Sequence, residues 1–398
     1  MPVPFSVASS TKPNVDEAIE EAFSEASRDL DGGVALLIAY LSYSKYPNHE
    51  AVKKALRKAV GEAPFIGIST AGEYVNDSAL SKSVVIALLS NKYFTASVGA
   101  SSNANVKPRE AGLKAVKDAL KNLKAPLPAN PLKPSVIALM HSVPGREEDV
   151  LIGVREGLGR HVAIVGGSSG DDFMLKPPLG YQVSSAGGGV NSVVVALIAT
   201  KLSYEVMGGH ACKATGKAGL VTKAGGAREE VIEEIDGAPA LRVYAEWLGL
   251  DEGRVRKEIL ALGLSSPLAL KDPVTGEYYI KHPAMVVGEA GVGCFASVPK
   301  NHVVHLMSND LSNAVDLGAK LASEVSGEPV GALLIHCAGL TAYIGERRAE
   351  FAKKLHESLG KAPLVGLAAY GEQWGYKEAG TESVHNNLTT ALLVFTKQ

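Results

Sequence analysis

The sequence contains little cysteine. Its 398 residues include only three cysteines, Cys212, Cys294 and Cys337, which are far apart and odd in number. A disulfide framework needs pairs of cysteines and a zinc knuckle needs a Cys-x-x-Cys spacing, so the sequence favours neither. We therefore expect three reduced thiols and a cytoplasmic location.

The chain also lacks an excess of charge of one sign and a long hydrophobic run. Forty basic residues face 42 acidic ones, and no segment combines clustered Lys and Arg with aromatic residues, so nucleic acid is not an expected partner. Apolar runs such as residues 193–199 are far shorter than the roughly 18 residues of a membrane-spanning helix, and residues 1–13 do not resemble a signal peptide. We expect a protein that is neither exported nor bound in a membrane.

Nucleotide and metal signatures are missing as well. The segment GEAGVG at 288–293 lacks the Gly-x-Gly-x-x-Gly spacing, and no Walker loop occurs. The nearest candidate metal ligands are His302 with His305 and Glu382 with His385, in segments expected to be extended or looped, where residues three apart face opposite ways. No cofactor and no metal are therefore expected.

What the chain does contain is a pattern that occurs three times. An apolar strand is followed by a helix with apolar residues at i, i+4 and i+8, and then by a second apolar strand. The three copies are residues 34–39, then Val52, Leu56 and Val60, then PFIGIST; residues 136–140, then Val150, Val154 and Leu158, then VAIVGG; and residues 333–336, then Phe351, Leu355 and Leu359, then PLVGLAA.

Each copy ends in a loop where glycine is followed by an acidic residue. The glycine always stands twelve residues after the last apolar helix position, and the pairs are Gly72 and Glu73, Gly170 and Asp171, and Gly371 and Glu372. Core packing explains the apolar helix positions but does not fix a loop glycine and a carboxylate in the same register. We therefore predict that the three units descend from one ancestral unit.

The repeat extends to the flanking elements. An amphipathic helix is expected before each unit, at about 14–29, 108–123 and 312–325, and an apolar strand after it, at 84–89, 193–199 and 390–395. The third unit follows a Gly-, Pro- and charge-rich region at about 205–300 with its own expected helix around 239–248. The pattern predicts an α/β protein with mixed sheets built from three strand-helix-strand units.

Strand-helix-strand connections are right-handed and join parallel strands, so the loops after both strands share one edge of the sheet. Ligands of open α/β sheets bind beyond that edge. Small hydrogen-bonding loops with carboxylates are suited to holding an ammonium group, while backbone N–H groups meet a carboxylate. The sequence therefore favours an amino-acid-like ligand.

Six segments in order give the chain a resemblance to the FIST family of sensory domains. GISTAGEY and VGGSSGDD resemble its N-terminal half, EEIDGAPALRVYAEWLG its middle, and HCAGL, YGEQ and VHNNLT its C-terminal half. The resemblance implies a ligand-sensing module with an N-terminal domain at 1–204 and a C-terminal domain at 205–398. It also implies a signalling partner, which stays unidentified because no output domain is recognised in the chain.

The resemblance and the loops together give a candidate ligand site. The family's usual Cys-x-Gly-Arg stands here as Cys337 to Leu340, so the anion-binding arginine is missing at that point. The residues expected at the site are Tyr370, Gly371, Glu372, Trp374, His336, Cys337 and Asn386, joined by Ser69, Thr70, Gly72, Glu73, Gly170 and Asp171 from the N-terminal half.

Two alternatives remain open. The segment from Gly166 to Gly170 fits Gly-x-Ser-x-Gly, so a hydrolase or transferase using Ser168 or Ser169 is conceivable, although Pro177 and Pro178 oppose the helix that a nucleophile elbow needs. Cys337 is a second candidate nucleophile, but neighbouring strand residues point to opposite faces, so it does not pair with His336. The other alternative to a sensor is a scaffold that binds another protein.

Overall fold

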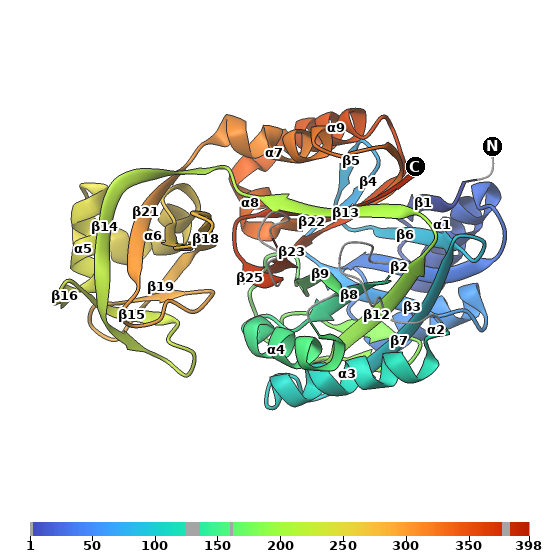
Figure 1. The fold of residues 1–398 in the computed structure, drawn as a ribbon, viewed down its shortest axis with the longest axis horizontal. Coiled ribbons are helices and arrows are strands. Elements are labelled where there is room, and N and C mark those ends of the chain that lie inside the picture. The colour runs from blue at the N-terminus through green and yellow to red at the C-terminus, as the bar shows by residue number, and fades with distance from the viewer. Residues whose placement is uncertain (1–2, 125–135, 160–161, 376–382, 398) are drawn as a thin grey trace.

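The computed structural model describes residues 3–124, 136–159, 162–375 and 383–397. Figure 1 shows two lobes. Within the described residues, the larger lobe contains three mixed six-stranded sheets, and the smaller lobe, residues 212–309, contains an eight-stranded antiparallel sheet. The larger lobe uses chain on both sides of the smaller one, so the smaller lobe is an insertion.

Local signals set the ends of the helices. Asn14 and Asn48 accept hydrogen bonds from the first free N–H groups of α1 and α2, and α2 ends at Gly61, whose φ of +63° suits glycine. The three predicted flanking helices are confirmed to within about two residues. They are α1 (Val15–Asp29), α3 (Pro108–Asn122) and α7 (Leu311–Ser323).

The three predicted strand-helix-strand units have the expected parallel strand pairs, β2 with β3, β8 with β9 and β22 with β23. The third unit carries a short additional helix before its long one. The units comprise β2 (Val34–Ser42), α2 (His49–Val60) and β3 (Phe65–Thr70); β8 (Val136–Ser142), α4 (Glu147–Leu158) and β9 (Ala163–Ser168); and β22 (Glu328–Cys337), α8 (Ala338–Ile344), η1 (Gly345–Arg347), α9 (Arg348–Ser358) and β23 (Leu364–Ala369).

The three sheets have one strand order. Their orders are β1-β6-β2-β3-β10-β11, β7-β12-β8-β9-β24-β25 and β13-β26-β22-β23-β4-β5. The remaining strands are β1 (Phe5–Ser10), β4 (Glu73–Val75), β5 (Ser78–Leu80), β6 (Val84–Ser90), β7 (Phe94–Ser101), β10 (Gln182–Ser184), β11 (Gly187–Gly189), β12 (Val193–Thr200), β13 (Ser203–Gly209), β24 (Glu372–Trp374), β25 (Val384–Asn386) and β26 (Thr390–Lys397).

Each sheet ends in a short hairpin from another unit. The hairpin β4–β5 of the first unit pairs with β23, β10–β11 of the second with β3, and β24–β25 of the third with β9. The units therefore form three sheets rather than one, and the exchange closes a cycle. Common descent of the units stays a prediction, as does a domain boundary at 204/205. Two of the three sheets contain strands from both sides of that boundary.

The core of the larger lobe lies between the three sheets. Buried side chains from every sheet, among them Tyr40, Leu139 and Ile335, form one hydrophobic cluster there. Helices cover the outer faces and bury three further clusters, so the sheets are apolar on both faces, as strands in the interior of α/β proteins are.

Helices α3 and α4 approach each other through glycine. A Cβ at Gly153 would lie 2.0 Å from the Arg109 carbonyl oxygen, and one at Gly112 would lie 2.3 Å from that of Val150. The two backbones are therefore in direct contact. This contact fixes the position of α4, and of the acidic residues at its start, relative to α3.

The smaller lobe packs helices α5 (Ala240–Leu248) and α6 (Glu252–Ser265) on its sheet around their own hydrophobic cluster. The helix expected around 239–248 is confirmed, with Pro239 immediately before its first residue. The strands of the smaller lobe are β14 (Cys212–Gly225), β15 (Val231–Ile235), β16 (Ala238–Pro239), β17 (Leu268–Lys271), β18 (Tyr278–Lys281), β19 (Pro283–Val287), β20 (Gly291–Cys294) and β21 (Val303–Asn309). A search of the described residues finds no helix with the length and apolar character needed to cross a membrane.

Candidate functional site

The three Gly-acid loops meet at one place and hydrogen-bond to one another, forming what we call the loop junction (residues 69–73, 168–171 and 368–372). The first loop joins the second, the second joins the third, and the third joins the first. The backbone bonds, donor first, are Gly170 N to Ser69 O (2.9 Å), Tyr370 N to Ser168 O (3.3 Å), Ser168 N to Gly371 O (2.9 Å), Ala71 N to Ala368 O (3.0 Å) and Ala368 N to Gly72 O (2.8 Å).

The carboxylates of the loop junction are fully buried and held by internal partners. Glu73 accepts hydrogen bonds from the Thr70 hydroxyl and from the Ser83 N–H and hydroxyl. Burial nevertheless raises the pKa of Glu73 to about 8, since desolvation penalises the charged form more than these bonds favour it. Glu73 is therefore a neutral structural group near pH 7.

The other two acidic residues are tied in similar ways. Asp171 accepts hydrogen bonds from Leu175 N and Lys176 N and from the Tyr370 hydroxyl, so it shapes its own loop and fastens the third loop to it. Glu372 accepts bonds from the Thr389 N–H at 3.2 Å and hydroxyl at 2.9 Å, and burial raises its pKa.

The remaining predicted site residues lie around the same junction. His336, Cys337, Trp374 and Asn386 are 0 to 5% exposed. His336 contacts the Thr390 hydroxyl at 2.9 Å and Trp374 donates to the Thr389 hydroxyl at 3.1 Å, while Asn386 donates to main-chain carbonyls. The structure thus brings the predicted residues together, but it places their side chains inside the protein.

The candidate nucleophiles are also inside. Ser168 is fully buried and donates to Glu147 Oε1 at 2.9 Å, and Ser169 donates to the Leu179 carbonyl at 2.7 Å. Burial raises the pKa of the Cys337 thiol well above its ordinary value, which opposes formation of a thiolate. Strand β9 ends at Ser168 and no helix begins there, so the nucleophile elbow is not formed.

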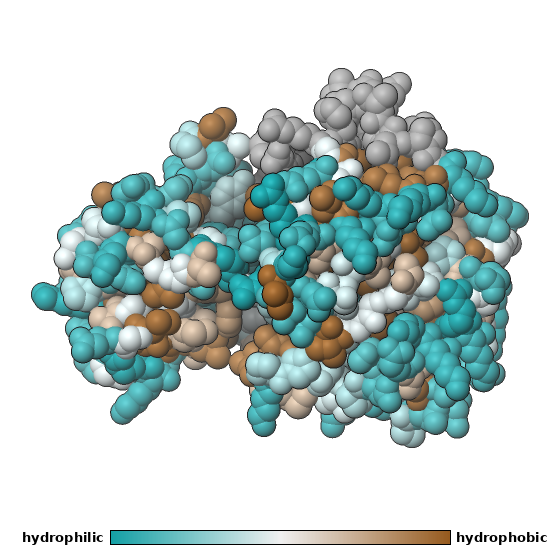
Figure 2. Space-filling model, turned by 90° about the horizontal axis from the view of Figure 1, so that it is seen from below, coloured by the Kyte–Doolittle hydropathy of each residue, from teal (hydrophilic) through white to brown (hydrophobic). Residues whose placement is uncertain are grey.

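Beside the loop junction, a pocket opens between the two lobes. Its volume is about 480 Å³, within the usual range for small-ligand sites. Figure 2 shows a hollow between the lobes, with hydrophobic residues at its edge. We call it the interlobe pocket, and its lining residues are Glu148, Asp149, Leu151, Ile152 and Arg155 of α4, Ala227, Arg228, Leu270, Tyr279, Lys281 and Ser297 of the smaller lobe, and Val384 and His385 of β25.

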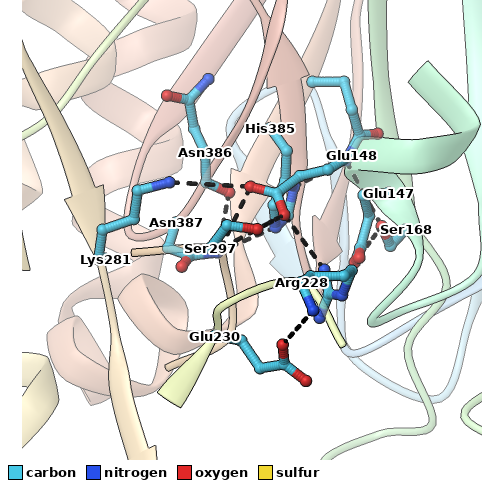
Figure 3. Close-up of polar contacts among 11 residues, drawn as sticks. Glu147, Glu148, Ser168, Arg228, Glu230, Lys281, Ser297, His385, Asn386 and Asn387 are labelled. Atoms are coloured by element: carbon cyan, nitrogen blue, oxygen red, sulfur yellow. Dashed lines mark hydrogen bonds and ion pairs between the residues drawn. The ribbon is translucent and has the colours of Figure 1, made fainter. Parts of the chain in front are cut away.

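Glu148 is the centre of the charges in the interlobe pocket (Figure 3). It accepts hydrogen bonds from the Ser297 N–H and hydroxyl, and it lies 3.3 Å from Arg228 Nη1 and 3.8 Å from Lys281 Nζ. Burial opposes ionisation of Glu148, but Lys281, His385 and its other partners together hold its pKa below the ordinary value. One carboxylate of the larger lobe thus faces two cations of the smaller lobe.

These two cations are only partly paired. The side chains of Arg228 and Lys281 are 13% and 8% exposed, and Arg228 Nε is buried with no hydrogen-bond partner among the described residues. Buried donors of charged groups are normally satisfied, so Arg228 has unused hydrogen-bonding capacity beside the pocket.

His385 connects the interlobe pocket to the loop junction. Its Nδ1 lies 3.4 Å from Gln373 Nε2 and its Nε2 lies 3.3 Å from Asn387 Nδ2. Gln373 in turn reaches the Ser168 hydroxyl at 3.5 Å, next to Glu147. A change in the pocket therefore has a short polar path to the place where the three loops meet.

The sequence suggests His385 only as a candidate metal ligand, and it does not point to Glu148, Arg228 or Lys281. The loop before α4 was noted for its place at the sheet edge, but nothing in the sequence pairs Glu148 with cations of the insertion. Glu382 lies outside the described residues, and those residues contain no group of three potential metal ligands.

Comparisons with known proteins identify the family. The FIST N domain model matches residues 35–238 and the FIST C domain model matches residues 240–374. No curated protein matches the chain. Among solved structures, cyanuric acid hydrolase from A. caulinodans is similar over 100% of both chains, with 9% identity and a TM-score of 0.37, which is too low to support any inference. The chain therefore belongs to the FIST family, whose domains are associated with small-ligand sensing in signalling proteins.

Proposed function

We propose that this chain is a cytoplasmic sensor that binds a small amino-acid-like molecule in the interlobe pocket. The observation that carries the proposal is the pair of cations, the largely buried Arg228 and the buried Lys281, which share the carboxylate of Glu148 in a pocket of about 480 Å³. Buried charge in excess of its partners indicates that a ligand completes the site.

The charges of the pocket suit a zwitterion. A ligand carboxylate would meet Arg228 and Lys281, whose N–H groups have unused capacity. A ligand ammonium would meet Glu148 and Asp149, which both line the pocket. The apolar side chains of Leu151 and Ile152 leave room for an uncharged ligand side chain.

The position of the pocket suits signalling. Its residues come from both lobes, so a ligand that contacts both would bias their relative arrangement by its difference in affinity for the two arrangements. We infer that an unidentified signalling protein binds one arrangement of the two lobes more tightly than the other. The sequence placed the ligand in direct contact with the loop junction. In the proposed site the ligand lies in the interlobe pocket instead, and His385 and Gln373 connect that pocket to the loop junction.

The first test is replacement of Arg228 by glutamine. Removing one partner of a buried charge pair weakens binding by about 2 to 5 kcal/mol, so the Kd for a bound amino acid should rise by roughly thirtyfold or more. Isothermal titration calorimetry with the proteinogenic amino acids, at pH 7, measures the wild type and the variant.

The control is Arg254→Gln, which removes an arginine of the same lobe whose side chain is 54% exposed and which, among the described residues, pairs with Glu258 on its own helix. It should bind like the wild type. No heat of binding from any amino acid, or the same Kd in R228Q as in the wild type, would reject the proposed ligand class or the proposed site.

A further inference from the structure

Lys281 is an unusual lysine because its amine is buried and faces a cavity. It stands at the end of β18, its side chain is 8% exposed, and it lines the interlobe pocket. Among the described residues its Nζ makes no hydrogen bond, and the nearest carboxylate oxygen is Glu148 Oε1 at 3.8 Å. Lysines are rarely buried in this way without close partners.

The surroundings of this amine lower its pKa. Desolvation by burial lowers the pKa of Lys281, and the Arg228 guanidinium acts in the same direction, against opposing contributions from Glu148 and Cys294. A desolvated lysine amine beside another cation is the arrangement that activates lysine as a nucleophile toward carbonyl groups.

We propose that Lys281 captures the carbonyl group of a small α-oxo acid as a reversible imine in the interlobe pocket. The inference rests on the proposed function, because it uses the same pocket and the same anion-binding groups. Arg228 would hold the carboxylate of the oxo acid, which places its neighbouring carbonyl carbon toward the amine that shares Glu148 with Arg228.

The bonding changes balance without a further reactant. The ammonium of Lys281 gives one proton to the carboxylate of Glu148, and the nitrogen forms a bond to the carbonyl carbon. The carbonyl oxygen takes up protons to become a hydroxyl and leaves as water, receiving the proton held by Glu148 and the second proton lost by nitrogen. The products are a protonated imine and one water molecule. Glu148 acts as the proton carrier because it faces Nζ at 3.8 Å.

The test is reductive trapping with pyruvate. The folded protein is incubated with pyruvate and cyanoborohydride at pH 8, and intact mass followed by peptide mapping locates the added group. We expect one reduced pyruvyl group per chain, at Lys281, and at least about tenfold slower labelling in Glu148→Gln. Lys281→Arg should lose the rapid labelling, whereas Lys300→Arg, which replaces an exposed lysine of the same lobe, should keep it.

The outcomes separate this inference from the proposed function. Labelling spread over exposed lysines in the wild type, with none concentrated at Lys281, overturns the imine even if Lys281→Arg fails to fold. Calorimetry on the same wild-type preparation decides independently whether the pocket binds amino acids, so a bound amino acid without trapping leaves the sensor proposal intact and removes only the covalent step.

Discussion

Replacing Gly153 with valine is expected to lower the free energy of unfolding by about 3 kcal/mol or more. The new Cβ would lie 2.0 Å from the Arg109 carbonyl oxygen on α3, and no side-chain rotation relieves a contact between a Cβ and a backbone atom. The two helices would have to separate, which exposes the cluster of apolar side chains beneath them. Urea denaturation followed by circular dichroism measures the change.

The substitution should also disturb the interlobe pocket, because α4 begins with Glu147 and Glu148. The matched control is Lys114→Val, which introduces the same β-branched residue at an exposed position of α3 and should cost only about 0.5 kcal/mol. A loss below about 1 kcal/mol for G153V would show that the helices do not pack through this glycine.

The second large effect is a fall in stability as the pH rises from 6.5 to 8. Glu73 has a pKa of about 8 in the folded protein and an ordinary value of 4.5 when exposed, so unfolding releases its proton in this range. The contribution of Glu73 to stability is present in full below pH 4.5, its pKa in the unfolded chain. It is lost as the pH rises toward about 8, its pKa in the folded protein, by up to about 1.4 kcal/mol per pH unit. Glu73 alone should remove about 1.5 kcal/mol, and Glu372 acts in the same direction.

Buried histidines produce the opposite slope in acid. Burial lowers the pKa of His141 and His336 to about 3 and that of His282 to about 4. The unfolded chain therefore binds more protons than the folded one below pH 6.5, and stability rises with pH up to that point. The two groups of residues together predict a maximum of stability near pH 6.5.

Urea denaturation at pH 5, 6.5 and 8 tests this profile. The double variant Glu73→Gln with Glu372→Gln should lose most of the alkaline slope, because an amide does not titrate. The acid slope should become steeper, because above pH 4.5 the two carboxyls oppose the contribution of the histidines. Glu62→Gln removes an exposed carboxyl and should follow the wild type. An alkaline slope of wild-type size in the double variant would mean that the junction carboxyls are already ionised at pH 6.5.

The contact between the two lobes depends on Glu148. Glu148 is the residue of the larger lobe that meets Ser297, Arg228 and Lys281 of the smaller lobe. Under the proposed function, a ligand carboxylate would compete with Glu148 for the same cations, so binding and lobe contact are expected to be coupled.

Much of the fold could be predicted from local patterns. The apolar positions Val52, Leu56 and Val60 identify one face of α2, and the flanking helices and the parallel strand pairs follow from the same periodicity. The exchange of hairpins between sheets could not be predicted. Strands β4, β10 and β24 are three residues long, and short strands carry too little pattern to indicate their partners.

The candidate site was predictable only in part. The predicted site combined residues of the loops at Gly72, Gly170 and Gly371, and these three loops hydrogen-bond to one another in the structure. It did not reveal whether their carboxylates face a ligand or the protein interior, because that depends on partners such as Ser83 and Thr389 that lie in other segments.

The sequence by itself determined the α/β class, the three strand-helix-strand units and the family, since each rests on periodicity and on short segments in a fixed order. The tertiary structure alone decided which polar groups face a cavity. Glu148, Arg228 and Lys281 come from separate elements in two lobes, and only folding places one partly buried carboxylate between two cations. Burial then gives that arrangement its strength, because charges removed from water must find partners in the protein or in a ligand.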